Sequence, residues 1–294
     1  MPQAQGDDGV RLYFEEVGSG VPILFVHEFA GDHRSWEPQV ARFGRSHRCI
    51  TYAARGYPPS DVPRDTVAYS MERATADAVA ILDHLGIERA HTVGLSMGGF
   101  TALHIALSHP QRTLSAVVAG VGYGAHPDVA EPFRRECEII AVALEKGGSP
   151  AFASEYAVGP ARVQFQNKDP RGWEVFVRRL AEHDATGAAL TMRGVQMARP
   201  SLYGLREQMA GVTVPVLILN GDEDEGCLEA GLMMKRTIPT AALVMLPRTG
   251  HTSNLEEPEA FNDAIAYLFT LTEAGRWTRR DPRSLRKSAT GMNG

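Results

Sequence analysis

The stretch AHTVGLSMGGFTALHIA, residues 90–106, decides the fold of this chain. Its first six residues, Ala90–Leu95, are a short apolar run that predicts a buried strand. Ser96 follows, with a glycine two positions before it and another two positions after it. Apolar residues then recur at helical spacing. Strand, tight turn and helix with one hydroxyl at the apex make the G-x-S-x-G pattern of a nucleophile elbow.

The glycines around Ser96 have a steric purpose, because a turn this sharp needs residues without a Cβ where strand and helix approach each other. The helix that begins at Met97 directs its first amide N–H groups toward the serine oxygen, where they can hold a negative charge. The same five residues also occur in ordinary glycine-rich turns. The rest of the chain therefore has to support the interpretation.

Composition places the chain among globular proteins. Its 294 residues suit one large α/β domain, or a core with an inserted subdomain. A net charge of −5 gives no reason to expect nucleic acid as a partner. Three widely spaced cysteines predict no disulfide framework and favour a reducing cytoplasm. We see no secretion signal and no membrane-spanning stretch.

Short apolar runs alternate with helical patterns along most of the chain. Strands are expected at residues 10–17, 22–27, 49–53, 90–95, 114–119, 214–220 and 241–246, and helices at 69–85 and 258–270. This alternation predicts an α/β fold with a mostly parallel, doubly wound sheet.

Residues 125–211 interrupt the alternation, since they contain helical stretches near 131–145, 172–182 and 188–197 and no strong strand signal. We expect a core of residues 1–124 and 212–275. Residues 125–211 should form a helical cap over the carboxyl edge of the sheet, where α/β proteins bind ligands. Residues 276–294 are basic, and we expect a mobile or surface-draped tail.

A serine hydroxyl needs a general base, and the base needs an orienting acid. Of the ten histidines, His251 is the best placed, because it follows the strand at 241–246 after a short loop and precedes the last helix. The acid should follow another strand. The strand at 214–220 leads into Asp222, Glu223, Asp224 and Glu225.

We favour Asp224 as the acid, because a G-x-x-D turn carries the fourth residue back over the sheet edge. Asp222 would then stabilise the turn by bonding its own backbone. A metal site is the other interpretation of this acidic run, but the run lacks neighbouring His or Cys ligands and the full spacing of a calcium loop. No metal or cofactor is expected. The order Ser96, Asp224, His251 is that of the α/β-hydrolase arrangement.

Two backbone N–H groups should bind the negative charge that develops on a substrate carbonyl oxygen. Met97 supplies one of them, and Phe29, in the loop after the strand at 22–27, supplies the other. Candidate apolar lining for a substrate includes Trp36, Tyr123 and Trp173, although each can equally be ordinary core.

With these residues in view, the chain resembles the α/β-hydrolase superfamily. It is most similar to the capped branch that includes enol-lactonases, carboxylesterases, C–C bond hydrolases and cofactor-free haloperoxidases. The resemblance is carried by PILFVHEFAGDHRSW (22–36), ARGYPPSD (54–61), VGLSMGGFTALHIA (93–106), VLILNGDEDEG (216–226) and RTGHTSNLEEPEAF (248–261). It implies the same nucleophile, acid, base and oxyanion donors, and it does not extend to residues 125–211.

One departure is informative. Where the family usually has His-Gly at the end of the oxyanion strand, this chain has His27-Glu28. Glu28 can tie down the loop, for example by pairing with Arg55. Alternatively, it can disfavour anionic substrates or adjust His251 as a substrate-binding residue. A second departure is Tyr57-Pro58-Pro59, which stands in place of a glycine-bearing turn. It leaves the shape of the loop after the strand at 49–53 open.

The prediction is a serine hydrolase that cleaves a small or medium ester or lactone through an acyl-enzyme. The same three residues also allow C–C bond hydrolysis or perhydrolysis, and a ligand sensor that retains them is a further alternative. Epoxide hydrolases and haloalkane dehalogenases have aspartate where this chain has Ser96. The expected partner is a small-molecule substrate, with no nucleic acid and no membrane. The sequence does not identify the substrate, and it does not decide whether the protein forms a homo-oligomer.

Overall fold

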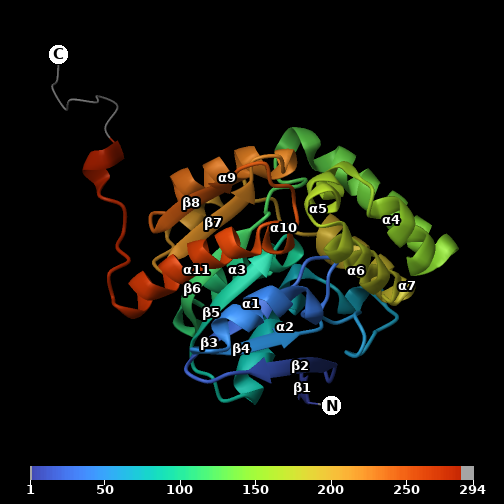
Figure 1. Ribbon diagram of the computed structural model, residues 1–294, viewed down its shortest axis with the longest axis horizontal. Helices are drawn as coiled ribbons and strands as arrows, with labels where there is room; N and C mark the ends of the chain where they lie inside the picture. The colour runs from blue at the N-terminus through green and yellow to red at the C-terminus, as the bar shows by residue number, and fades with distance from the viewer. Residues whose placement is uncertain (1, 286–294) are drawn as a thin grey trace.

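The structure, a computed structural model, describes residues 2–285. In this part of the chain eight strands form one sheet, in the order β1-β2-β4-β3-β5-β6-β7-β8 (Figure 1). The strands are β1 Gln3–Gln5, β2 Arg11–Val17, β3 Val21–Val26, β4 His47–Tyr52, β5 Ala90–Leu95, β6 Thr113–Ala119, β7 Val216–Gly221 and β8 Ala241–Leu246. Only the pairs β1–β2 and β2–β4 are antiparallel, so the predicted α/β class with a mostly parallel sheet is confirmed.

Helices cover both faces of the sheet, because side chains alternate between the faces along each strand. Ile23 and Phe25 of β3 pack with α1 and α11. Leu24 and Val26, the residues between and after them, pack on the opposite side with α2. Strands buried on both faces read as continuous apolar runs, which is why the sequence pattern located them.

The helices of the core are α1 Glu37–Phe43, α2 Met71–His84, α3 Met97–Ser108, α9 Glu225–Thr237, α10 Ser253–Glu256 and α11 Pro258–Glu273. Short 3₁₀ turns add η1 His33–Trp36, η2 Thr66–Ala68, η3 Pro110–Arg112 and η6 Pro282–Leu285. No helix in residues 2–285 combines the length and apolar character needed to cross a membrane.

The remaining helices lie between β6 and β7. They are α4 Pro127–Tyr156, η4 Pro160–Arg162, α5 Val163–Lys168, α6 Pro170–Ala181, α7 Ala185–Thr191, the π-helix η5 Met192–Met197 and α8 Arg206–Ala210. Figure 1 shows α4 to α7 gathered at one end of the sheet. A break inside α4 occurs at Gly148, where φ is 74°, in the Gly-Gly pair that interrupts the sequence pattern.

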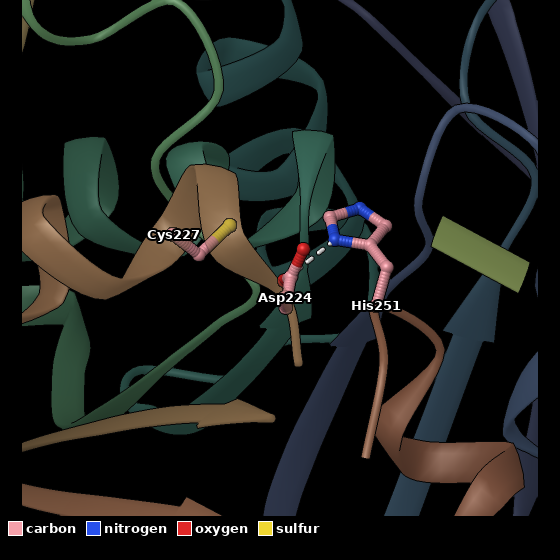
Figure 2. A group of neighbouring side chains, drawn as sticks. All are labelled: Asp224, Cys227 and His251. Carbon is pink, nitrogen blue, oxygen red and sulfur yellow. Dashed lines mark hydrogen bonds and ion pairs between the residues drawn. The ribbon is translucent and has the colours of Figure 1, made fainter. Parts of the chain in front are cut away.

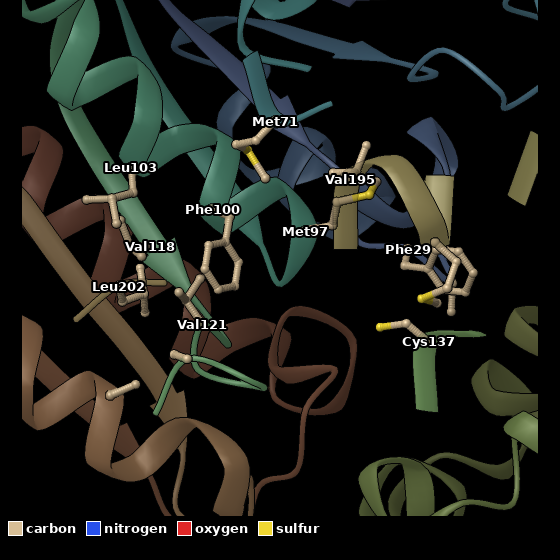
Figure 3. Packing of buried hydrophobic residues seen from close by; sticks show 14 of the residues in the cluster. Phe29, Met71, Met97, Phe100, Leu103, Val118, Val121, Cys137, Val195 and Leu202 are labelled. Carbon is tan, nitrogen blue, oxygen red and sulfur yellow. The ribbon is translucent and has the colours of Figure 1, made fainter. Parts of the chain in front are cut away.

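Buried side chains connect this helical insertion to the core. One cluster contains Phe100 and Leu103 of α3 together with Cys137 of α4 and Val195 of η5 (Figure 3). The insertion therefore shares its apolar packing with the helix that follows the elbow.

Several elements lie outside the sequence-based expectation. β1, α1, α5 and α9 were not expected, because their sequences are short, polar or interrupted by glycine. The acidic run, in which we expected a G-x-x-D turn, continues into α9, whose first residue is Glu225.

Part of the predicted tail is draped on the surface. The indole N–H of Trp277 donates to the carbonyl of Thr240 at 2.8 Å, and the N–H of Arg280 donates to the carbonyl of Pro239 at 2.9 Å. These contacts hold residues 277–280 beside the start of β8. The prediction for residues 286–294 lies outside the described residues.

The elbow between β5 and α3 has the expected strained geometry. Ser96 has φ 53° and ψ −116°, a conformation that residues with a side chain rarely adopt. A Cβ added to Gly94 would lie 1.9 Å from the carbonyl oxygen of Gly98, and one added to Gly98 would lie 1.9 Å from that of Val26. Both positions therefore have to be glycine for α3 to pack against β3 and β5.

Gly98→Ala should destabilise the protein by about 3 kcal/mol, because the new methyl group overlaps backbone that cannot move without displacing β3. Urea denaturation gives the free energy of unfolding. Gly211→Ala is the control, since its Cβ would lie 3.4 Å from the nearest atom, the carbonyl oxygen of Gln208. An equal effect of the two substitutions would contradict this account of the elbow.

Candidate active site

Three loops at the strand ends meet at one cavity. Ser96 follows β5, Gly120 follows β6 and His251 follows β8, and all three line a cavity of about 230 Å³. Residues of the insertion, among them Arg162 and Arg199, also line this cavity. The carboxyl ends of parallel strands lie at one edge of a sheet, which explains why residues so distant in sequence converge here.

His251 is held by Asp224. Its Nδ1 lies 2.8 Å from Oδ2 of Asp224, and both side chains are buried (Figure 2). Burial alone would raise the pKa of Asp224, but the charge and hydrogen bond of His251 hold that pKa below its usual value. An ionised carboxylate only accepts hydrogen bonds. Nδ1 therefore donates, and the proton that the charged ring can release is the one on Nε2, which then carries a lone pair.

Asp222 has a different role from the one expected for it. Its Oδ1 accepts a hydrogen bond from the N–H of Thr249 at 3.2 Å, so it bonds the histidine loop and not its own backbone. The prediction about its partner was wrong, because that partner lies 27 residues away in sequence and local turn chemistry does not reveal it.

A second carboxylate, Glu256 of α10, fixes the loop on both sides of His251. It accepts from the N–H of Gly250 at 2.7 Å and from the N–H of Thr252 at 3.0 Å. The N–H of His251 itself donates to the carbonyl of Ala161 in the insertion at 3.3 Å. The position of His251 thus depends on both the core and the insertion.

Tyr123 and Cys227 surround Asp224. The ring of Tyr123 packs edge-on against the imidazole of His251, with centroids 5.3 Å apart. After His251, the Cys227 and Tyr123 side chains also act to lower the pKa of Asp224. Burial, and then the negative charge of Asp224, raise the pKa of the Cys227 thiol.

Possible metal-ligating atoms of Asp224, Cys227 and His251 lie within 4.8 Å of one another (Figure 2). The sequence analysis missed this convergence, because it considered only the acidic run. A metal would require a Cys227 thiolate and the Nδ1 that already bonds Asp224. The raised thiol pKa and the Asp224–His251 bond both favour the hydrogen-bonded arrangement over a metal site.

The proposed oxyanion donors flank the serine. Phe29 lines the cavity, and Met97 is the first residue of α3. Within residues 2–285 neither backbone N–H has a protein acceptor, so both are free to bind a ligand. The carbonyl of Phe29 accepts from the hydroxyl of Tyr57 at 2.9 Å, which orients this peptide.

His27 positions the same loop. The N–H of Ala54 donates to its Nε2 at 3.0 Å, and its Nδ1 lies 2.7 Å from the carbonyl oxygen of Glu28. Because Nε2 accepts, the proton is on Nδ1 and is donated to Glu28. Burial lowers the pKa of His27, which keeps the ring in this neutral form.

Glu28 ties down the loop, although Arg55 is not its partner. Arg55 binds Asp77 at 2.6 Å and Asp8 at 2.8 Å. The carboxylate of Glu28 instead pairs with Arg162 of η4 at 2.5 Å, and both side chains are buried. The suggested pairing of Glu28 with Arg55 was therefore wrong. The actual partner, Arg162, belongs to the insertion, to which the family resemblance did not extend.

Comparison with known proteins identifies the family of this fold. The family model for the alpha/beta hydrolase fold matches residues 21–258. The chain belongs to the α/β-hydrolase family. The 3-oxoadipate enol-lactonase 1 of Acinetobacter baylyi is 30% identical to it over 240 residues, which are 81% of this chain and 85% of that protein.

Two solved α/β-hydrolase structures are similar along nearly their whole length. The enol-lactonase from Burkholderia xenovorans LB400 has a TM-score of 0.79 and 26% identity, covering 92% of this chain and 100% of that one. A thermophilic esterase from Thermogutta terrifontis, solved with malate bound, has a TM-score of 0.81 and 25% identity, covering 92% and 98%.

The suggested apolar lining is divided between cavity and core in this α/β-hydrolase. Tyr123 lines the cavity. Trp36 is buried beside Phe25 and Phe261, on the α1–α11 face of the sheet. Trp173 donates its indole N–H to the carbonyl of Ala157 at 2.9 Å and is not part of the cavity wall. Neither tryptophan lines this cavity in residues 2–285, and their roles as substrate contacts stay predictions that no observation here tests.

Four residues that the sequence analysis did not single out also belong to this site: Arg162, Arg199, Cys227 and Glu256. Glu256 carries a detectable signal, because it lies five residues after His251 at the start of the last helices. Arg162 and Arg199 lie in the insertion, where the resemblance ends.

Glu28→Gln should lower the free energy of unfolding by about 3 kcal/mol, because it leaves the Arg162 charge buried without its counterion. The double variant Glu28→Gln/Arg162→Met should recover much of this loss, since it removes both charges. Denaturation curves of the single and double variants give the comparison.

Glu182→Gln is the matched control, because Glu182 also joins the insertion to the core, through Arg34 at 2.7 Å, but its side chain is 58% exposed. It should cost about 0–1 kcal/mol. If Glu28→Gln costs no more than this control, Glu28 and Arg162 do not form a buried pair.

The cysteines should be unreactive in the native protein. Burial raises the pKa of Cys49 to about 12 and that of Cys137 to about 11, and Cys227 is shifted in the same direction. A thiol whose pKa lies above the solution pH stays protonated, and only the thiolate reacts with disulfide reagents. At pH 8, Ellman's reagent should therefore label the protein after unfolding in guanidinium and not before. Rapid labelling of a native thiol would contradict these shifts.

Proposed function

We propose that this protein is a serine hydrolase that cleaves a small or medium carboxylic ester or lactone through an acyl-enzyme. The observation that carries the proposal is the Asp224–His251 hydrogen bond at 2.8 Å, with His251 lining the same cavity as a strained Ser96. Relatives described as enol-lactonase and esterase support this class of substrate.

In the proposed reaction Ser96 attacks the carbonyl carbon while Nε2 of His251 takes its proton. Asp224 orients the imidazole and stabilises the imidazolium that forms. The N–H groups of Phe29 and Met97 bind the oxyanion, and each such donor is worth about 2.7–4 kcal/mol in the transition state. His251 then gives its proton to the leaving alkoxide, and a water molecule, activated by His251, hydrolyses the acyl-enzyme.

We also propose that residues 125–211 act as a cap over the substrate. Support comes from the cavity wall, to which the insertion contributes Tyr156, Arg162 and Arg199. The bond from the N–H of His251 to the carbonyl of Ala161 would couple the cap to the base. Substrate selection would then depend on side chains of α4, η4 and η5.

A fluorophosphonate probe should label the wild-type protein covalently and should not label Ser96→Ala, because only an activated serine attacks the phosphorus. Labelling is read by gel fluorescence and by mass spectrometry of the modified peptide. A panel of p-nitrophenyl esters of increasing acyl length then tests turnover, which should favour short and medium chains. An unlabelled wild-type protein would contradict the nucleophile assignment.

The acid is tested by a matched pair of substitutions. Asp224→Asn should lower kcat by about 10⁴-fold, by holding the imidazole in the wrong tautomer, whereas Asp222→Asn should have a much smaller effect. A larger loss from Asp222→Asn would reverse the assignment. Cleavage of a ring-cleavage dienoate without ester turnover would indicate C–C bond hydrolysis, and labelling without turnover of any substrate would favour a ligand sensor.

A further inference from the structure

The loop that carries His251 is strained. Arg248, three residues before the histidine, has φ 54°, which lies in the left-handed region that residues with a side chain rarely adopt. A strained backbone of this kind persists only where the surrounding structure holds it in place. The contacts made by this loop therefore decide where the imidazole of His251 lies.

Glu256 holds the loop on both sides of His251. Its Oε2 accepts from the N–H of Gly250 at 2.7 Å, and its Oε1 accepts from the N–H of Thr252 at 3.0 Å. The N–H between them, that of His251, donates to the carbonyl of Ala161 at 3.3 Å. Three successive peptide groups are thus fixed, two of them by a single carboxylate.

Capping of α10 explains only one of these two bonds. Thr252 directly precedes the first residue of α10, and a carboxylate near the start of a helix often accepts the N–H of the residue that precedes it. Gly250 lies two residues farther from the helix, so capping gives no reason for its bond to Glu256. A Cβ added to Gly250 would lie 3.1 Å from Oε1 of the same carboxylate. The side chain of Glu256 therefore packs directly against the histidine loop.

The surroundings of Glu256 oppose its charge. The residue is 6% exposed, and burial raises the pKa of its carboxyl group against the effect of the two N–H groups. Two cations act against burial more weakly: Lys168 of α5, which pairs with Glu257, and Arg162 of η4, which pairs with Glu28. A carboxyl group whose pKa is raised by folding is ionised at the expense of the folded state. Stability alone therefore does not explain a carboxylate at this position.

We propose that Glu256 is a positioning residue for the proposed hydrolase reaction, and that its ionised carboxylate fixes the backbone of His251 so that Nε2 can reach Ser96. An ionised carboxylate accepts hydrogen bonds on both oxygens, whereas a protonated one uses one oxygen as a donor. Protonation of Glu256 therefore releases one side of the loop. This inference rests on the proposed hydrolase function, because it concerns the regulation of the same base.

Glu256→Gln tests this role, because the side chain keeps its size but has an NH₂ group in place of one acceptor oxygen. With p-nitrophenyl butyrate, kcat should fall about 10- to 100-fold, the effect of a small displacement of a catalytic group, and KM should change little. Rates are expressed per active site titrated with the fluorophosphonate probe, so that unfolded protein does not contribute. An unchanged kcat with a lower melting temperature would mean that Glu256 only caps α10, and would overturn the proposal.

Glu257→Gln is the matched control. Glu257 is the next residue and carries the same charge, but its carboxylate pairs with Lys168 and its side chain is 39% exposed. Its removal should leave kcat unchanged. Glu256→Asp keeps the charge on a shorter side chain and should retain more of kcat than Glu256→Gln does. If Glu257→Gln and Glu256→Gln slow the reaction equally, the effect comes from lost negative charge, and the positioning role is refuted.

The pH profile of kcat/KM gives a readout that helix capping would not change. In the wild type both His251 and Glu256 have to lose a proton, so log kcat/KM should fall with a slope approaching about 2 as the pH falls through the raised pKa of Glu256. Glu256→Gln should show a slope of about 1, and Glu256→Asp should keep the steeper limb. Tryptophan fluorescence defines the pH range over which each protein is folded. Equal slopes in the wild type and Glu256→Gln would refute the second ionisation.

Hydrogen exchange separates this proposal from the hydrolase function. Backbone amides in peptides that cover residues 247–256, followed by mass spectrometry, should exchange faster in Glu256→Gln than in the wild type, and Glu257→Gln should leave them unchanged. Faster exchange in a protein that neither reacts with the fluorophosphonate nor turns over any ester would contradict the hydrolase function and retain the positioning role. Ester turnover with the same kcat and the same exchange in the wild type and Glu256→Gln would refute the positioning role alone.

Discussion

A buried ion pair between Glu28 and Arg162 couples the parts of this site to one another. Glu28 belongs to the oxyanion loop, and Arg162 to the helical insertion. Arg162 also bonds Thr252, the residue after His251, and stacks over Tyr156 and Phe176. A buried guanidinium tolerates little displacement from its counterion. The loop, the insertion and the histidine segment therefore hold one another in a single arrangement.

The sheet and the insertion supply different residues of the site. Strand ends deliver Ser96, Asp224 and His251 to one edge, because parallel strands place their carboxyl ends together. The insertion contributes part of the cavity lining, including Arg162 and Arg199. Arg162 is neutralised by Glu28, and Arg199 donates to the carbonyl of Tyr123 and to the side chain of Gln196.

Sequence reasoning succeeded where the deciding physics is local. The elbow follows from the glycines at 94 and 98, because a Cβ at either position meets backbone. It was less successful in identifying the hydrogen-bond and ion-pair partners of individual side chains. Asp222 bonds Thr249 and Glu28 bonds Arg162. Turn chemistry suggested that Asp222 would bond its own backbone, and Arg55 was offered as an example of a partner for Glu28. Trp36 could not be assigned to core or cavity, since an aromatic residue after a strand suits both.

The sequence by itself determined the α/β class, the strand and helix order around the elbow and the residues that offer a serine, an acid and a base. These features depend on periodicity, backbone sterics and chain order, all of which can be read within a few residues. Only the tertiary structure decided that Asp224 contacts His251 and that Glu28 is neutralised by Arg162. Such contacts join segments far apart in the chain, and they exist only after the sheet and the insertion have packed.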